Sequence, residues 1–142
     1  MKMSHLMTPT PVTISPEESV AVASRTLTHY NIGIIPVCTP DGSLQGVLTD
    51  RDIVTRCLAG GKDPNKTPVR DIMTSQVRTA SPNMDHSAAA HLMGSQQIRR
   101  LPVIEEGKLC GMLSLGDLAT HEDTAIDAAD ALSGITSNIS VR

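Results

Sequence analysis

The sequence lacks the aromatic residues that fill most protein cores. It has no Trp and no Phe, and Tyr30 is the one Tyr among its 142 residues. The core is therefore predicted to consist of Ile, Leu, Val, Met and Ala, and base stacking on Trp, Phe and Tyr side chains is excluded as a binding mode. Lys and Arg number 12 against 15 Asp and Glu, which gives a formal net charge of −3. This acidic balance argues against a nucleic-acid partner.

Long apolar runs and paired cysteines are also missing. No stretch approaches the roughly 20 apolar residues that span a bilayer, and the first residues, Met1–Leu6, contain no apolar core of a signal peptide. We therefore expect no membrane partner and a cytoplasmic location. Cys38, Cys57 and Cys110 are an odd number without a close pair. They predict buried, reduced thiols rather than a disulfide framework.

Motifs of catalysis and of metal binding are absent as well. The sequence contains no phosphate-binding P-loop, no Gly-x-Ser-x-Gly and no Gly-x-Gly-x-x-Gly. Its five histidines show no metal-ligand spacing with the cysteines. We therefore expect no enzyme, no catalytic residues, no catalytic cofactor and no metal site.

What the sequence does contain is an internal repeat. A shift of 66 residues aligns Pro36-Val37 with Pro102-Val103, and after one deletion a shift of 65 aligns Gly46–Thr49 with Gly111–Ser114. Self-similarity at one spacing indicates two copies of one structural unit. The predicted segments are repeat 1 (3–60), a linker (61–68), repeat 2 (69–121), and a C-terminal acidic helix and tail (122–142).

Each repeat is predicted to run strand, helix, strand, strand, helix. Ser15-Pro16 and Ser81-Pro82 are typical helix starts, with Ser as the cap and Pro at the first helical position. In repeat 1, short apolar strands are predicted at 34–38 and 44–48, and a second helix at 50–59.

One such repeat is too small to bury both faces of its sheet. We therefore expect the two repeats to pack through their sheets with pseudo-two-fold symmetry. The predicted fold is one compact α+β module with two symmetry-related clefts. In the tail, a short helix from Asp123 to Leu132 is expected to stop at Ser133-Gly134.

The two repeats resemble a tandem pair of cystathionine β-synthase (CBS) domains, a Bateman module. The resemblance is carried by the strands Ile34–Val37 and Arg100–Val103 and by the Gly-apolar-apolar-Thr/Ser-x-x-Asp endings at 46–52 and 111–117. Both motifs occur twice, in the same order and at one spacing. The chain is similar to small stand-alone bacterial CBS-pair proteins.

The resemblance implies a non-catalytic regulatory module. Such modules bind an adenosyl ligand (AMP, ADP, ATP, NAD or S-adenosylmethionine) in clefts between the repeats, signal its occupancy to an effector protein, and commonly form homodimers. The alternative is a ligand-free scaffold for dimerisation or protein interaction. We keep both interpretations.

The Thr/Ser-x-x-Asp endings have a chemical rationale. Thr49 and Asp52, like Ser114 and Asp117, are three residues apart at a helix start, so a hydroxyl and a carboxylate share one face. A carboxylate there can accept hydrogen bonds from the two hydroxyls of a ribose. The same residue types are also typical of helix caps, and one residue can serve both purposes.

Carried over from the family, each cleft joins this motif of one repeat to segments of the other. Because two guanidinium groups suit a phosphate, the cleft with Arg99 and Arg100 is expected to be the stronger nucleotide site. The alternative is that Arg99 and Arg100 are a solvated pair at the start of a strand. Cleft two is expected to bind nucleotides more weakly or to take an uncharged adenosyl group. Predicted cleft one consists of Thr49, Asp52, Val77, Arg78, Ile98, Arg99 and Arg100, and predicted cleft two of Ser114, Asp117, Pro11, Val12, Ile32, Gly33 and Ile34.

Overall fold

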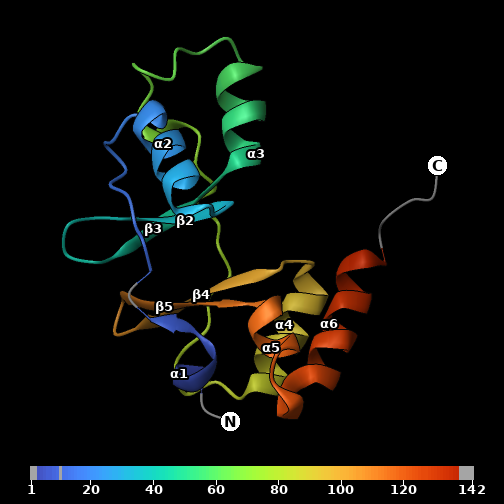
Figure 1. Ribbon diagram of the computed structural model, residues 1–142. Coiled ribbons are helices and arrows are strands. Elements are labelled where there is room, and N and C mark those ends of the chain that lie inside the picture. The colour runs from blue at the N-terminus through green and yellow to red at the C-terminus, as the bar shows by residue number, and fades with distance from the viewer. Residues whose placement is uncertain (1–2, 10, 138–142) are drawn as a thin grey trace. The chain divides into compact units, whose positions relative to one another are not determined.

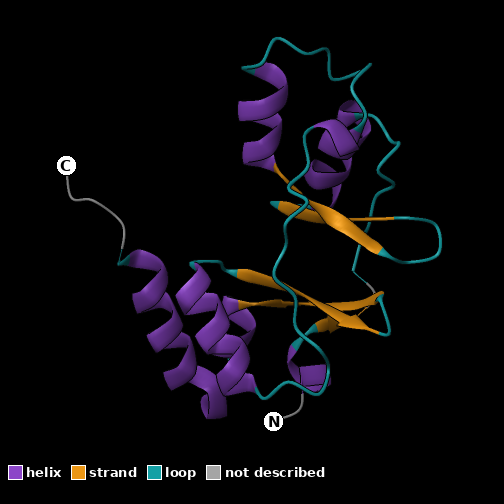
Figure 2. Cartoon of the chain, turned by 180° about the vertical axis from the view of Figure 1, so that it is seen from behind, coloured by secondary structure: helices purple, strands orange, loops and turns teal. Residues whose placement is uncertain are grey.

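The computed structural model describes residues 3–9 and 11–137, which form a mixed helix-and-strand fold, as the sequence predicts (Figures 1 and 2). The chain divides into two compact units. Unit 1 comprises residues 1–11, 78–106 and 110–142, and unit 2 comprises residues 12–77 and 107–109. The last residues of the predicted tail, 138–142, lie outside the described residues.

Unit 2 is built on an antiparallel hairpin. β2 (Ile34–Cys38) pairs with β3 (Leu44–Thr49), and Ile34 lies opposite Thr49. The turn between the strands contains Gly42 at φ 89°, a conformation that favours glycine. The strand predicted before the first helix is reduced to one residue, Ile14, which forms a parallel bridge with Val37.

Helices cover one side of this hairpin. α2 (Val20–Tyr30) and a second helix, formed by α3 (Asp50–Asp52) and the π-helical η1 (Ile53–Leu58), lie on the same side of β2 and β3 (Figure 1). A short 3-10 helix, η2 (Val69–Asp71), follows the linker. The core between these elements is aliphatic, as predicted. It comprises Ile14, Val20, Ala23, Leu27, Ile35, Val37, Leu48, Ile53, Cys57, Val69 and Ile72.

Unit 1 repeats this plan with additions at both ends of the chain. Its sheet has the order β1-β5-β4, with β1 at Thr8–Pro9, β5 at Lys108–Ser114 and β4 at Arg100–Glu105. The helices are α1 (Met3–Leu6), α4 (His86–Gln96), α5 (Leu115–Ala119), the 3-10 helix η3 (Glu122–Thr124) and α6 (Ala125–Thr136). Its core includes Met3, Leu6, Ala89, Met93, Leu101, Val103, Leu113 and Leu118.

Each unit is completed by the first residues of the other repeat. In unit 2, Val47 and Thr74 exchange two backbone hydrogen bonds of 2.9 Å. At the equivalent place in unit 1, Thr8 pairs with Met112. The compact units therefore exchange the first residues of the two sequence repeats.

Two glycines permit these pairings. A Cβ atom at Gly46 would lie 2.4 Å from the backbone oxygen of Thr74, and one at Gly111 would lie 2.4 Å from the sulfur of Met7. Only a residue without a side chain allows such close approach. The obstacle is a fixed backbone atom in unit 2 and a flexible side chain in unit 1.

Helices α2 and α4 begin about one turn later than predicted. Ser15 accepts a hydrogen bond from the Glu17 N–H at 3.3 Å within a turn, whereas the N-cap of α2 is Ser19, which accepts from the Val22 N–H at 3.2 Å. Likewise, α4 begins at His86 rather than after Ser81. The Ser-Pro pairs therefore start turns that lead into the helices.

The tail helix passes through its predicted stop. α6 continues over Ser133-Gly134 to Thr136. The reason is close packing in unit 1, because a Cβ atom at Gly134 would lie 2.7 Å from the backbone oxygen of Gly94 on α4. Among the described residues, no helix has the length and apolar character that crossing a membrane requires.

Candidate functional site

Thr49 and Asp52 form a reciprocal capping box where β3 runs into α3. The Thr49 hydroxyl accepts from the Asp52 N–H, and the Asp52 carboxylate accepts from the Thr49 N–H, both at 3.1 Å. This box satisfies two backbone donors that a helix start otherwise leaves open. The cap interpretation of this motif is therefore confirmed, with one carboxylate oxygen of Asp52 engaged in it.

The surroundings of Asp52 engage the carboxylate further. The side chain is buried, the Thr74 hydroxyl donates to its Oδ2 at 3.4 Å, and Arg56 Nη1 lies 3.7 Å from its Oδ1. Arg56 also donates to the backbone oxygens of Ile72 and Met73, at 3.1 and 3.2 Å. Asp52 thus belongs to a polar cluster that fastens the start of repeat 2 to unit 2.

Ser114 and Asp117 form the same box in unit 1. The Ser114 hydroxyl accepts from the Asp117 N–H at 3.0 Å, and Asp117 Oδ2 accepts from the Ser114 N–H at 2.8 Å. The backbone angles of Ser114 (φ −114°, ψ 157°) nearly equal those of Thr49 (φ −112°, ψ 161°). Asp117 is half-buried, and among the described residues its carboxylate forms no ion pair. Among the described residues, its Oδ1 forms no hydrogen bond either.

The segment before each Pro-Val strand lies against the helix start of its own repeat. The Asp50 N–H donates to the Gly33 oxygen at 3.2 Å, and the Leu115 N–H donates to the Arg99 oxygen at 2.8 Å. In unit 1 this places the backbone of Arg99, which precedes Arg100, next to the Ser114–Asp117 box. Both arginine side chains are exposed, and neither forms an ion pair within the part of the chain that is described.

Each predicted cleft draws residues from both compact units. The structure brings together those residues of a cleft that belong to the same unit. That the residues from the two units meet in one cleft stays a prediction. Of cleft one, unit 2 holds Thr49, Asp52 and Val77, and unit 1 holds Arg78, Ile98, Arg99 and Arg100. Of cleft two, unit 1 holds Ser114, Asp117 and Pro11, and unit 2 holds Val12, Ile32, Gly33 and Ile34.

The thiols fit structural positions. Cys38 and Cys57 are buried and Cys110 is half-buried, and all three are unpaired. Burial raises the pKa of the Cys38 thiol and of the Cys110 thiol, which keeps both protonated and unreactive at neutral pH.

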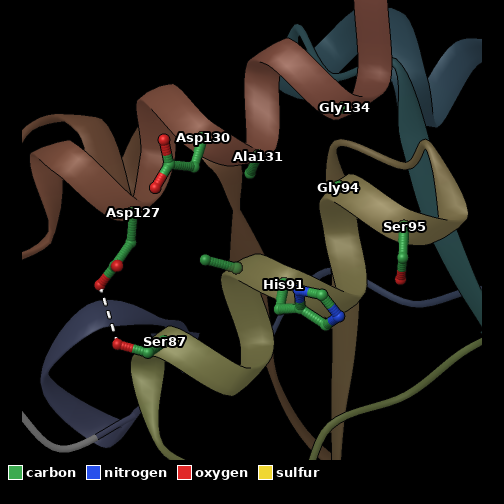
Figure 3. Close-up of a pocket in the computed structure, with 9 residues that line it drawn as sticks. Ser87, His91, Gly94, Ser95, Asp127, Asp130, Ala131 and Gly134 are labelled. Carbon is green, nitrogen blue, oxygen red and sulfur yellow. Dashed lines mark hydrogen bonds between the residues drawn. The ribbon is translucent and has the colours of Figure 1, made fainter. Parts of the chain in front are cut away.

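A second candidate site lies between α4 and α6. A groove of about 440 Å³ there is lined by small residues together with His91, Asp127 and Asp130 (Figure 3). Ser87 donates to Asp127 at 3.1 Å across the two helices. Within the described residues, no group of three or more His, Cys, Asp or Glu side chains is placed to hold a metal ion.

Sequence reasoning missed Arg56 and Thr74. The signal for Arg56 was present, because residues four apart on a helix are neighbours and Arg56 follows Asp52 by four. No local signal existed for Thr74, which is 22 residues away and reaches Asp52 only because repeat 2 begins inside unit 2.

Comparison with known proteins identifies the repeated unit. The family model of the CBS domain matches twice, at residues 3–59 and 69–124. The chain belongs to the CBS-domain family. It is a CBS-domain pair, which is a regulatory module, and the family matched is not a catalytic one.

Individual relatives agree with this assignment. The CBS domain-containing protein YhcV of Bacillus subtilis is 39% identical over 130 residues, which cover 92% of this chain and 91% of that protein. A crystal structure of Hypoxic Response Protein I, with two coordinated zinc ions, is 30% identical with a TM-score of 0.79 and covers 85% and 98% of the two chains. A crystal structure of CBSX2 in complex with AMP is 27% identical with a TM-score of 0.72 and covers 82% and 91%.

Proposed function

We propose that this CBS pair binds an adenosine nucleotide and passes its occupancy to an effector protein. The observation that carries the proposal is the Ser114–Asp117 box in unit 1, which adjoins the backbone of Arg99, the residue before Arg100. The proposal is supported by CBSX2, a protein of related fold whose structure contains AMP.

The site offers a distinct group to each part of a nucleotide. Asp117 Oδ1 accepts a ribose hydroxyl, and the Ser114 hydroxyl still has its own proton to donate. Arg99 and Arg100 attract the phosphate. α5 has only five residues, so we assign the phosphate to these guanidinium groups rather than to the helix start. AMP, ADP and ATP fit this chemistry better than an uncharged adenosyl group.

The ribose assignment is compatible with the helix cap. Asp117 uses Oδ2 for the Ser114 N–H, so a ligand at Oδ1 costs the helix nothing. A hydrogen bond to a charged group contributes about 1.5–3 kcal/mol. Its loss is expected to weaken binding roughly 10- to 150-fold.

Isothermal titration of the full chain with AMP, ATP and adenosine tests the proposal. We expect both nucleotides to bind, and adenosine to bind more weakly because it lacks the phosphate. The variant Arg99→Ala/Arg100→Ala is expected to lose affinity for ATP and keep that for adenosine, with the exposed Lys66→Ala as the matched control. Equal losses for ATP and adenosine contradict the phosphate role, and no heat with any of the three contradicts nucleotide binding.

The second candidate function is a scaffold for protein contact. The observation that favours it is a set of exposed large hydrophobic side chains, all of them on helices. Thermal unfolding separates the two functions, because a ligand at 100 times its Kd stabilises the folded state by about 2.7 kcal/mol. No stabilisation by any adenosyl ligand, NAD and S-adenosylmethionine included, favours the scaffold.

A further inference from the structure

The methionine side chains of this protein differ in their access to solvent. Among the described residues, three of them are buried: Met3, Met93 and Met112. Three others are half-buried: Met7, Met73 and Met84. A small dissolved oxidant can reach a half-buried thioether sulfur and is kept from a fully buried one, so the second group contains the methionines that are open to oxidation.

The thiols compete poorly for such an oxidant. The reactive form of a cysteine is the thiolate. Burial raises the pKa of the Cys38 thiol and of the Cys110 thiol, which disfavours the thiolate in both. The remaining thiol, Cys57, is buried with 0% exposure. The half-buried thioethers are therefore the sulfur atoms that an oxidant meets first.

Two of these three methionines occupy equivalent places in the two repeats. The shift of 66 residues that relates the repeats also aligns Met7 with Met73. Each of them directly precedes the residue through which the beginning of its repeat pairs with a strand of the other repeat. These residues are Thr8, which pairs with Met112, and Thr74, which pairs with Val47.

Both equivalent sulfur atoms pack on a strand glycine. A Cβ atom at Gly111 would lie 2.4 Å from the sulfur of Met7, and one at Gly46 would lie 3.2 Å from the sulfur of Met73. Each thioether thus fills space that a side chain on the strand would otherwise take. Met84 is different, because it lies between a turn and α4 and packs on the core of unit 1.

We propose that Met7 and Met73 are a pair of reversible modification sites, at which a peroxide oxidises the thioether to a sulfoxide and so removes it from its strand glycine. The sulfur lone pair attacks one oxygen of H₂O₂ while the O–O bond breaks. That oxygen stays on the sulfur, and the other leaves as water with both hydrogen atoms. The sulfur loses two electrons and the peroxide gains them. Methionine sulfoxide reductases reverse the change.

The sulfoxide is incompatible with the packed position. Its oxygen is a strong hydrogen-bond acceptor, and a buried polar group without a partner costs free energy. The side chain is therefore expected to turn toward water, which loosens the beginning of the repeat. In unit 1, Met7 supplies the three atoms nearest to a Cβ at Gly111. In unit 2 the effect is expected to be smaller, because Arg56 also holds the backbone oxygens of Ile72 and Met73.

Peroxide treatment of the full chain, followed by peptide mass spectrometry and thermal unfolding, tests the proposal. We expect Met7 and Met73 to gain one oxygen atom about tenfold or more faster than the buried methionines. The melting temperature is expected to fall by about 3 °C or more and to recover after treatment with methionine sulfoxide reductases. Oxidation of the buried methionines first contradicts the proposal, and so does an unchanged melting temperature once Met7 and Met73 are fully oxidised.

Leucine variants assign the effect to individual sites. Met7→Leu and Met73→Leu remove the sulfur and keep an apolar side chain of similar size, and Met84→Leu is the matched control at the third half-buried site. After peroxide treatment, the chain with both Met7→Leu and Met73→Leu is expected to keep its melting temperature. Met84→Leu is expected to lose as much as wild type. The reverse result, with protection by Met84→Leu alone, contradicts the proposal.

Hydrogen exchange of the oxidised wild-type chain gives a readout that needs no variant. The amides of Val47 and Thr74 are protected by their two mutual hydrogen bonds of 2.9 Å. We expect both to exchange about fivefold or more faster after oxidation, because local opening becomes easier. Unchanged protection of these amides in chains oxidised at Met73 contradicts the proposal. None of the residues involved belongs to the proposed nucleotide site, so these results are independent of nucleotide binding.

Discussion

The two Thr/Ser-x-x-Asp boxes have the same backbone geometry and different surroundings. In unit 2, Asp52 is buried and in contact with Arg56 and Thr74. In unit 1, Asp117 is half-buried and its Oδ1 has no hydrogen-bond or ion-pair partner among the described residues, with Arg99 at the adjoining backbone. The duplicated element therefore preserves the cap in both copies, and among the described residues Asp52 alone of the two carboxylates has side-chain partners beyond the box.

The difference between the surroundings of Asp52 and Asp117 indicates which copy of a duplicated motif can bind a ligand. The first residues of each repeat, its lead-in, pair with a strand of the other repeat through the backbone, at Thr74 in unit 2 and at Thr8 in unit 1. The lead-in of repeat 2 is also held by Arg56, which donates to its backbone oxygens. A side chain already used for packing has little left to offer a ligand. This supports the proposal that the ribose contact lies at Asp117, and the joining of Asp52 with Arg99 and Arg100 in one cleft stays a prediction.

The largest expected effect is on the glycines of the lead-in pairings. Gly46→Ala is expected to lower the free energy of unfolding by about 3 kcal/mol, because the new methyl group meets the Thr74 backbone oxygen at 2.4 Å. Gly111→Ala, the matched variant, is expected to cost about 1 kcal/mol or less, since the Met7 side chain can move. Urea unfolding measures both, and equal losses contradict the difference between the units.

The two acids come next. Asp52→Ala is expected to lower the free energy of unfolding by about 2–3 kcal/mol, because it removes the cap together with the contacts to Arg56 and Thr74. Asp117→Ala is expected to cost about 1 kcal/mol, since only the cap is lost. Thermal unfolding compares the two. A larger loss for Asp117→Ala reverses the assignment of structural and available carboxylate.

A smaller effect is expected from the cation that holds Asp52. Arg56→Ala is expected to cost about 1 kcal/mol, because Arg56 is half-exposed and solvent screens its ion pair. Its equivalent, His121, contacts the backbone oxygen of Asp117 and not the carboxylate. We expect His121→Ala to leave AMP affinity unchanged, as titration of both variants measures. A large loss of AMP affinity with His121→Ala would contradict the view that the Asp117 carboxylate binds the ligand without support from His121.

The smallest effect concerns pH. The Thr39 hydroxyl and Lys108 lower the pKa of Asp41 well below its usual value, and Lys108, the first residue of β5, lies in the segment 107–109 that clusters with unit 2. A lowered pKa in the folded state stabilises it fully above the unfolded value of about 3.9. That stability is lost as the pH falls further. The difference in melting temperature between wild type and Asp41→Asn is therefore expected to shrink from pH 5 to pH 2, and a constant difference contradicts the assignment.

Much of the fold was predictable because the same local sequence patterns occur in both repeats. The Pro-Val strands, the turn at Gly42 and the Gly-x-x-Thr/Ser-x-x-Asp endings are local patterns, and the structure has them. The helix starts were wrong because Ser15-Pro16 is equally suited to a turn, and Ser19 caps the helix instead. The stop at Gly134 was wrong because that glycine serves tertiary packing against α4.

The candidate site was predictable in its residues and less so in its asymmetry. Spacing alone identified both acids as members of helix-start motifs. It gave no means of telling Asp52 from Asp117, because their difference comes from Thr74, a residue brought in by the exchanged lead-in. Long-range contacts of this kind leave no local pattern in a sequence.

Titration of AMP into wild type, Asp117→Asn and Asp52→Asn tests the central claim most directly. Asn keeps a side-chain oxygen for the cap and loses the charge. We predict that Asp117→Asn weakens binding about tenfold or more and that Asp52→Asn, while folded, stays close to wild type. The opposite pattern, with affinity lost in Asp52→Asn and kept in Asp117→Asn, would contradict the claim that the available carboxylate of unit 1 holds the ribose.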